Sequence, residues 1–341
     1  MPKTAQPTIN DVARVAGVSK KTVSRVLNRA PSLTDNTRRR VETAMGELGY
    51  SPNPQARALA LGRTFLIGLV HDNPSAQTVM NIQQGMLEAI HDTEFEMVVR
   101  PVERGSPTML DDLRRFFERQ RPFGVLLMSP VSENPAVVRL CEEIGCRYMR
   151  IGSVVEGAPE HLVTSNDREA VREATEHLIA LGHRRIGLVM GPSGFGSARE
   201  RQLGFEEALR SADIPLPPSL VAQGNYLFDS GVVAAYRLLD AMPRPTAIFA
   251  SNDEMAAGVI HAACQRGLDV PRDLSVVGFD DTAIAAHIWP PLTTVRRPIT
   301  AMAQAATIKL IKSVARSDAA DVSARYPSTL IRRASTAAPR Q

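Results

Sequence analysis

The 341-residue chain has few of the residues that build disulfide or metal-held frameworks. Its three cysteines form no C-x-x-C pair and leave an odd count, so we expect a reducing compartment rather than a disulfide framework. Its seven histidines form no H-E-x-x-H or similar cluster. The sequence therefore predicts no metal site, and we expect no cofactor.

The chain also lacks the hydrophobic segments that carry proteins to or into membranes. No charged-then-apolar secretory leader begins the sequence, and no run of about 18 apolar residues occurs. Hydrophobic residues make up 44% and charged residues 22%, which is typical of a soluble globular protein. We expect a cytoplasmic protein without membrane contact, long enough for two or three domains.

Charge is unevenly distributed along the chain. Residues 1–63 hold eleven Lys and Arg against four Asp and Glu, a balance of +7. The remaining residues hold 29 against 32, a balance of −3. A basic head on a slightly acidic body indicates a polyanion-binding module attached to a part that does other work.

Residues 8–28, TINDVARVAGVSKKTVSRVLN, predict two short amphipathic helices joined by a turn. Thr8 and Ser19 are placed to cap the helices, and Gly17 suits the tight turn between them. The second helix turns cations outward on a rod that fits the major groove of DNA, although a cationic face can also be simply solvated. This outward face consists of Lys20, Lys21, Thr22 and Arg25. The pattern predicts a helix-turn-helix.

A third helix and a linker follow the first two helices. Thr34 is placed to cap the third helix and Gly49 to end it. The basic run at residues 38–40 either contacts phosphates or is solvated. Residues 50–64 contain two prolines and a helix-prone stretch of about two turns, which is marginal by itself in water. We interpret this stretch as a hinge that folds only when it docks.

From residue 65 onward, apolar runs alternate with helical stretches. The predicted strands are residues 65–70, 96–99, 124–128, 184–190, 246–251 and 274–280, and the predicted helices include 79–91, 167–181, 198–212 and 253–266. Such alternation predicts parallel sheets covered on both faces. The expected fold is thus a small all-α helix-turn-helix head followed by an α/β body of two doubly wound parallel-sheet lobes with a cleft between them.

Several motifs in order resemble the lactose/galactose repressor (LacI/GalR) family of bacterial transcription regulators. They lie at residues 8–28, 50–59, 67–70, 174–187, 251–258, 276–281 and 290–298. The resemblance implies a helix-turn-helix domain at residues 1–49, a hinge at 50–64, and a periplasmic-binding-protein-like effector-binding and dimerisation domain at 65–341. It further implies a repressor of sugar catabolism or uptake genes, controlled by a small carbohydrate-like effector.

The resemblance also implies how DNA is bound. Lys20, Lys21 and Arg25 align with residues that read base edges, while Thr22 and Ser24 are better placed for phosphates. Leu59 aligns with a leucine that is wedged between base pairs in the minor groove and kinks the duplex. Two hinges are needed to open one groove, so we expect a homodimer on a near-palindromic double-stranded operator. The full set of expected DNA contacts is Thr8, Ser19, Lys20, Lys21, Thr22, Ser24, Arg25, Asn28, Tyr50, Asn53, Ala56 and Leu59.

Polar residues at strand ends of the body are expected to bind the effector, since ligands of open α/β sheets lie at the carboxyl ends of strands. Asp72, Asn73, Asn252 and Asp280 stand at such ends, and the resemblance adds Arg201 and Tyr226, which align with effector-contacting residues of the family. Asn252 equally suits the cap of the helix after it. The family commonly has Gln where this chain has Arg297; that cation would favour an acidic or phosphorylated sugar, or pair with a neighbouring carboxylate.

Two other functions would suit the same α/β body. One is a sugar- or nucleotide-handling enzyme, because GPSGFG at residues 191–196 follows a strand and precedes a helix, as phosphate-binding loops do. It fits neither G-x-G-x-x-G nor G-x-x-x-x-G-K-[ST], so we expect no enzyme. The other is a solute-binding protein for transport, which would need a secretory leader and have no use for the basic head. Whether an effector weakens or strengthens DNA binding stays open, with an inducer preferred.

Overall fold

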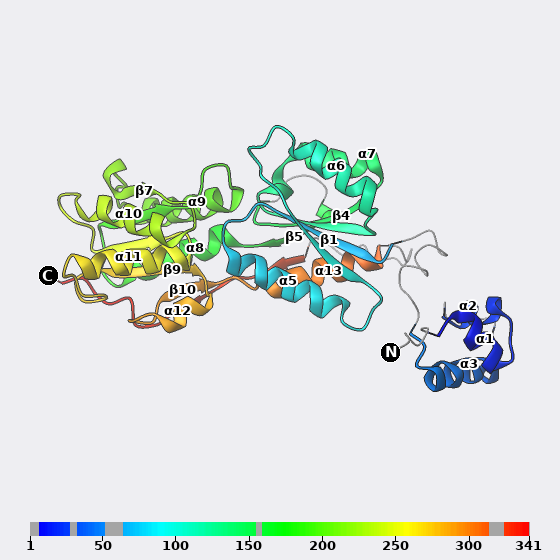
Figure 1. The fold of residues 1–341 in the computed structure, drawn as a ribbon. Coiled ribbons are helices and arrows are strands. Elements are labelled where there is room, and N and C mark those ends of the chain that lie inside the picture. Colours follow the sequence, from blue (N-terminus) through cyan, green and yellow to red (C-terminus); the bar gives the residue numbers. More distant parts are fainter. Residues whose placement is uncertain (1–6, 28–32, 52–63, 155–158, 314–323, 341) are drawn as a thin grey trace, which may run out of the picture. The chain divides into compact units, whose positions relative to one another are not determined.

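The computed structural model describes residues 7–27, 33–51, 64–154, 159–313 and 324–340. The chain forms two compact units that divide between Phe65 and Leu66. The first unit is a small helical head and the second is a larger α/β body (Figure 1). Each unit is described by itself below.

The head consists of α1 (Ile9–Ala16), α2 (Lys20–Leu27) and α3 (Asp35–Leu48). Thr8 caps α1 in a capping box with Asp11, and Thr34 caps α3. The helices bury a small apolar core of Val12, Ala13, Ala16, Val23, Val26, Val41 and Ala44. The predicted helix-turn-helix and its third helix are confirmed.

The turn between α1 and α2 depends on glycine and on an arginine from α3. Gly17 has φ 62°, a left-handed conformation that glycine adopts without strain. Arg40 Nη2 donates to the carbonyl oxygens of Ala16, at 2.7 Å, and Gly17, at 3.3 Å. Part of the basic run at residues 38–40 therefore stabilises the turn rather than being simply solvated.

The first lobe of the body is a six-stranded parallel sheet. Its order is β11 (Ala324–Tyr326), β5 (Leu162–Ser165), β4 (Arg147–Gly152), β3 (Gly124–Met128), β1 (Leu66–His71) and β2 (Glu96–Pro101). One face packs against α5 (Ala76–Ile90) and α13 (Ile299–Lys312), and the other against α6 (Met109–Gln120) and α7 (Pro135–Ile144). Neighbouring residues alternate between these faces: Leu69 belongs to the α5 side and Val70 to the α6 side.

The second lobe repeats this design. Its sheet has the order β12 (Thr329–Ile331), β10 (Thr293–Arg296), β9 (Ser275–Asp280), β8 (Ala247–Ala250), β6 (Ile186–Met190) and β7 (Val221–Gln223), with β12 antiparallel to β10. One face carries α8 (Asp167–Ala180) and α9 (Gly196–Ser211), and the other α10 (Phe228–Leu239) and α11 (Asp253–Gln265). The remaining described elements are α12 (Ala283–His287) and the 3-10 turns Val131–Glu133, Pro159–His161 and Pro218–Leu220. The predicted pair of doubly wound lobes is confirmed.

Helices α8 and α9 pack closely because of one glycine. A Cβ atom built on Gly204 of α9 would lie 2.1 Å from the carbonyl oxygen of Arg168 in α8. No side chain fits in that space without moving a helix backbone. Gly204 thus fixes the distance between the two helices.

Within the described residues, the chain crosses between the lobes from β5 to α8, from β10 to α13 and from β11 to β12. The crossing segments are hydrogen-bonded to one another. The Ser328 amide donates to Asn166 Oδ1 at 2.6 Å, and Arg297 Nε donates to Ser165 Oγ at 2.9 Å. Any change in the angle between the lobes must therefore strain or break these hydrogen bonds between the crossing segments.

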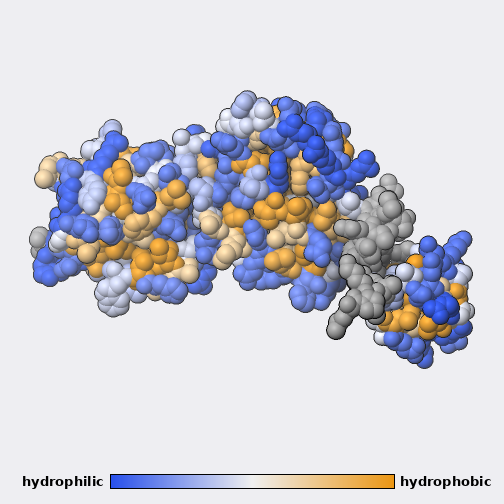
Figure 2. Space-filling model, in the orientation of Figure 1, coloured by the Kyte–Doolittle hydropathy of each residue, from blue (hydrophilic) through white to orange (hydrophobic). Residues whose placement is uncertain are grey.

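Hydrophobic residues also reach the surface of both lobes (Figure 2). Met80 and Leu87 on α5 are 60% and 51% exposed, and Val233 on α10 is 69% exposed. Met80 and Leu87 are seven residues apart on α5 and so lie on the same side of that helix.

Candidate functional site

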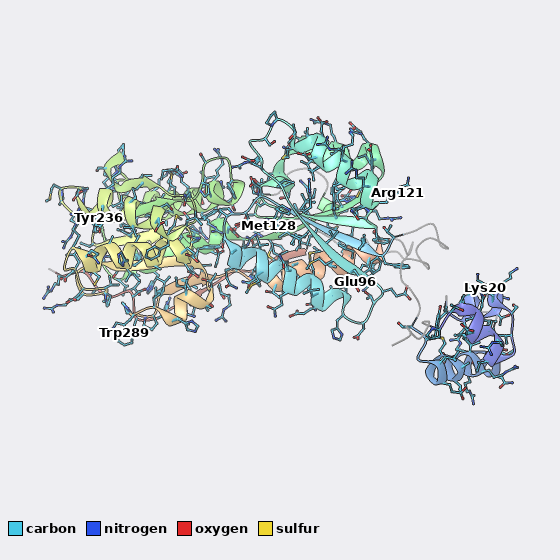
Figure 3. The ribbon with its side chains drawn as sticks, viewed as in Figure 1. Lys20, Glu96, Arg121, Met128, Tyr236 and Trp289 are labelled. Carbon is cyan, nitrogen blue, oxygen red and sulfur yellow. The ribbon has the colours of Figure 1, made fainter. Side chains whose placement is uncertain are left out.

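The outward face of α2 is the candidate DNA-reading surface. Lys20, Lys21 and Arg25 are exposed, while Thr22 and Ser24 are half-buried (Lys20 is labelled in Figure 3). Lys20 and Lys21 stand in the first turn, where the helix dipole disfavours cations, and no acidic residue accompanies them. The placement costs local stability and concentrates positive charge on one end of a helix.

Other residues predicted to contact DNA also stabilise the fold of the head. Thr8 Oγ1 donates to Asp11 Oδ2 at 2.7 Å, which lowers the pKa of Asp11 to about 2. Ser19 Oγ accepts from the Thr22 amide at 3.1 Å and so caps α2, as predicted. The backbone amide of Tyr50 closes the end of α3, and burial raises the pKa of its half-buried phenol. Asn28, Asn53, Ala56 and Leu59 lie outside the described residues.

The body contains a polar cavity where the carboxyl ends of strands from both lobes meet. The first lobe contributes Asn73 after β1 and Ser129 after β3, beside Met128 (labelled in Figure 3). The second lobe contributes Arg201, Tyr226, Asn252 and Asp280. This is the position at which ligands bind open α/β sheets. The cavity has a volume of about 20 Å³, enough for roughly one water molecule and too small for a sugar without movement of the lobes or side chains.

Arg201 is the centre of the cavity's electrostatics. Its Nε lies 3.1 Å from Asp167 Oδ2, its Nη1 donates to the Ser251 carbonyl at 2.5 Å, and its Nη2 lies 3.4 Å from Asp280 Oδ1. Burial would lower the pKa of Arg201, but Tyr226 and the two carboxylates raise it above its usual range. Arg201 is a permanent cation in the cavity wall, and each of its three nitrogens has a hydrogen-bond partner.

Asp167 balances this cation and a second one. Its side chain is fully buried and also lies 3.6 Å, through Oδ1, from Arg297 Nε. Burial alone would raise the pKa of Asp167, but Arg297 and Arg201 hold it below its ordinary value. A single carboxylate is therefore shared between two buried guanidinium groups.

The two remaining predicted residues from the second lobe support each other. Asn252 Nδ2 donates to the Tyr226 carbonyl at 2.9 Å, and its Oδ1 accepts from the Met255 amide at 3.0 Å. Asn252 therefore caps α11 and lines the cavity at once. Tyr226 and Asp280 have φ angles of 71° and 101°, a strained conformation for residues other than glycine. Such strain is often found at ligand sites.

A second, more open pocket of about 380 Å³ lies beside the cavity, also between the lobes. Asp72 lines this outer pocket rather than the inner cavity, whereas Asn73 lines both. Arg104 of the first lobe lies with its Nε 3.7 Å from Asp72 Oδ2, and its Nη1 donates to the Gly194 carbonyl of the second lobe at 3.0 Å. Its guanidinium also stacks on Phe195 of the second lobe. These contacts connect the two lobes at the edge of the outer pocket.

The structure thus brings together five predicted effector contacts, Asn73, Arg201, Tyr226, Asn252 and Asp280, and sets Asp72 apart. Sequence reasoning missed Asp167 and Arg104, and weighed Arg297 without assigning it to the site. A repeat could have revealed Asp167. Ser165-Asn166-Asp167 stands at the end of β5 as Ser251-Asn252-Asp253 stands at the end of β8, and both aspartates are buried.

The glycine-rich loop at residues 191–196 has an internal partner where a phosphate would bind. The Gly196 amide at the start of α9 donates to Glu133 Oε2 of the first lobe at 2.8 Å. A carboxylate therefore occupies the anion position, and the loop joins the lobes.

Among the residues that the structure describes, no group of three or more His, Cys, Asp or Glu side chains is placed to hold a metal ion. No helix of this described part of the chain has the length and apolar character needed to cross a membrane.

Two different families match the basic head and the α/β body. Residues 8–53 match the family described as bacterial regulatory proteins, lacI family. Residues 175–336 match the family described as periplasmic binding protein-like domain.

Two curated relatives are similar to the chain over nearly their whole length. The probable HTH-type transcriptional repressor ExuR of Bacillus subtilis (strain 168) is 32% identical over 313 residues, which cover 90% of this chain and 91% of that protein. The lactose operon repressor of Escherichia coli (strain K12) is 31% identical over 334 residues, covering 97% and 91%.

Solved structures show the same architecture. The lac repressor dimer bound to operator and the anti-inducer ONPF matches with a TM-score of 0.82 at 29% identity, covering 97% of this chain and 99% of that one. The transcriptional regulator CelR–cellobiose complex matches with a TM-score of 0.73 at 31% identity, covering 96% and 99%.

Proposed function

Since this chain belongs to the lacI family of bacterial regulatory proteins, we propose that it is a DNA-binding repressor of sugar-catabolism genes whose operator binding is set by a small sugar held between the lobes of the body. The observation that carries this proposal is the polar cavity at the strand ends of both lobes, in a chain whose head exposes cations on α2. The relatives are transcriptional regulators, so the enzyme alternative is rejected. The basic head also argues against a transport protein.

Each proposed domain has its own role. Residues 1–49 bind DNA, residues 50–64 form the hinge, and residues 65–341 bind the effector and form the dimer. Lys20, Lys21 and Arg25 contact base edges. The effector contacts Asn73, Arg201, Tyr226, Asn252 and Asp280, with Asp72 at the outer pocket. The protein works in the cytoplasm, where its operator lies.

The regulatory step is a shift between arrangements of the lobes. A sugar does not fit in a cavity of about 20 Å³, so it binds to a form in which the lobes or the side chains around the cavity have moved. A ligand with different affinity for the two forms shifts their populations and acts as an inducer when its preferred form binds operator poorly.

The working unit is a homodimer on a near-palindromic operator, which lets two heads bind two half-sites. Met80 and Leu87 on α5 and Val233 on α10 offer exposed apolar surface for that contact. Sedimentation of the full chain tests this: Met80→Asp is expected to weaken the dimer, and an unchanged dimer would place the contact elsewhere.

The DNA-reading proposal is tested with a duplex selected from random sequences. Lys21→Ala is expected to cost about 1–3 kcal/mol in specific binding, measured by fluorescence anisotropy. The control is Arg14→Ala, which removes an exposed cation from α1 instead. Equal losses in the two variants would show that net charge, and not the face of α2, governs binding.

The sensing proposal is tested by thermal unfolding with a panel of sugars. A ligand at about 100 times its Kd adds roughly 2.7 kcal/mol to stability. Asp280→Asn keeps a residue that tolerates positive φ but removes the carboxylate, and it is expected to lose the shift while still binding DNA. A fully responsive variant would move the effector away from this cavity.

A further inference from the structure

Arg297 has a buried guanidinium nitrogen without a hydrogen-bond partner. The residue is 9% exposed, lies on the crossing segment between β10 and α13, and lines the cavity. Its Nε donates to Ser165 Oγ at 2.9 Å and lies 3.6 Å from Asp167 Oδ1. Its Nη2 is buried and has no partner among the described residues. An unsatisfied buried donor on a charged group is unfavourable, so it indicates a place for an acceptor.

Arg201, the other cation of the cavity wall, shows the contrast. Each of its three nitrogens has a partner, namely Asp167, the Ser251 carbonyl and Asp280. Asp167 is already shared by both guanidiniums and is fully buried. Apart from Asp167, no carboxylate of the described residues forms an ion pair with Arg297, and Asp280 acts on it through charge alone.

We infer that the effector is a sugar acid whose carboxylate accepts a hydrogen bond from Arg297 Nη2. This inference rests on the proposed function and adds the chemical class of the effector. A carboxylate matches the planar guanidinium and needs few donors. A phosphate carries three acceptor oxygens and more charge, whereas Arg297 Nη2 is the guanidinium nitrogen of the wall that is buried without a partner among the described residues. The observations thus favour a carboxylate over a phosphate.

The carboxylate of Asp280 does not oppose this placement. It lies beside Arg201 Nη2 at 3.4 Å, and burial raises its pKa although Arg201 and Arg297 act against that rise. Its charge is already paired with that of Arg201, which reduces its repulsion of a bound anion. Asp280 then accepts hydrogen bonds from the hydroxyl groups of the sugar, while Arg297 donates to its carboxylate.

The test compares neutral sugars with acids oxidised at one carbon and with a phosphorylated sugar. The full chain is titrated by calorimetry with galactose and galacturonate, glucose and glucuronate, glucose and gluconate, and glucose 6-phosphate. At least one acid is expected to bind about 10–100-fold tighter than its neutral counterpart, as a charge-assisted hydrogen bond provides. Arg297→Gln is expected to abolish that preference, and Arg297→Lys to retain part of it.

The matched control is Arg296→Gln, since Arg296 is the adjacent residue, its side chain is 57% exposed, and it pairs with Asp281 outside the cavity. This variant is expected to keep the full preference for the acid. If Arg297→Gln fails to fold, the inference is tested by Arg297→Lys and by the comparison of acids with neutral sugars on the unsubstituted chain.

The outcomes separate this inference from the function on which it rests. A neutral sugar that binds as tightly as its acid and alters operator binding overturns the inference and leaves the proposed function standing. Binding of the phosphate alone overturns it in favour of a phosphorylated sugar. If no acid binds more tightly than its neutral counterpart, the inference is wrong; if in addition no sugar changes operator affinity, the proposed function fails as well.

Discussion

Replacing Arg201 with methionine tests whether the buried ion network holds the body together. The change keeps most of the side-chain volume but removes the partner of Asp167, Asp280 and the Ser251 carbonyl. The side chain of Asp280 is 15% exposed and can accept from water, whereas that of Asp167 is fully buried and cannot. Removing one partner of a buried pair costs about 3–5 kcal/mol. We expect about 3 kcal/mol, because Arg297 still lies 3.6 Å from Asp167.

The cost of this change depends on pH in a defined direction. In the native body, Arg297 and Arg201 keep the pKa of Asp167 below its ordinary value against the opposing effect of burial. Without Arg201, the folded-state pKa of Asp167 rises, and a buried acid with a raised pKa is more costly as pH increases. The destabilisation is therefore expected to be larger near about pH 8 than near about pH 5.

Urea unfolding of the full chain followed by circular dichroism measures both effects. Asp167→Asn in the Arg201→Met background is expected to recover part of the stability near neutral pH, since the uncompensated charge is gone. A loss below about 1 kcal/mol, or a loss equal at both pH values, would refute the argument that Asp167 depends on Arg201 for its charge.

Three further predictions follow from particular contacts. Burial, with Asp280 as a neighbour, raises the pKa of Asp253 to about 7, so stability falls by about 1.4 kcal/mol per pH unit between roughly pH 4 and 7; Asp253→Asn is expected to flatten that slope in urea unfolding. Gly204→Ala places a Cβ against the Arg168 carbonyl and is expected to cost about 1–3 kcal/mol by the same measurement. Lys20→Glu is expected to abolish specific DNA binding in anisotropy while slowing hydrogen exchange of α2 amides, because an anion suits the first turn of a helix.

The regular parts of the fold were predictable from local patterns. The head helices and their caps follow from short-range spacing, and β1, β2, β3, β6, β8 and β9 follow from apolar runs. Other strands lack such a run. β4 contains Arg147 and Arg150, of which the second is buried, and β5, β7, β10 and β11 have three or four residues each, too short to show a period.

The candidate site was predictable where chemistry stands at the end of a recognisable strand. Asn73, Asn252 and Asp280 follow apolar runs, so the sequence placed them. The remaining parts of the ion network depend on segments far apart in the chain. Asp167 and Arg297 belong to different crossings between the lobes, and only the tertiary fold brings them to 3.6 Å.

The two surfaces proposed for function share one physical property, which is that each contradicts a local rule. Lys20 and Lys21 place positive charge at the positive end of a helix dipole, and Arg297 buries a donor that the described chain leaves without an acceptor. In each case, the free protein is less stable than it would be with a residue that follows the local rule at that position. Each cost is offset by the same kind of partner, an anion: the phosphates and base acceptors of DNA at the head, and the carboxylate of a sugar acid in the body. A binding partner that offsets a defect of the free protein gains affinity from it, so the residues that violate local preference are those expected to carry recognition.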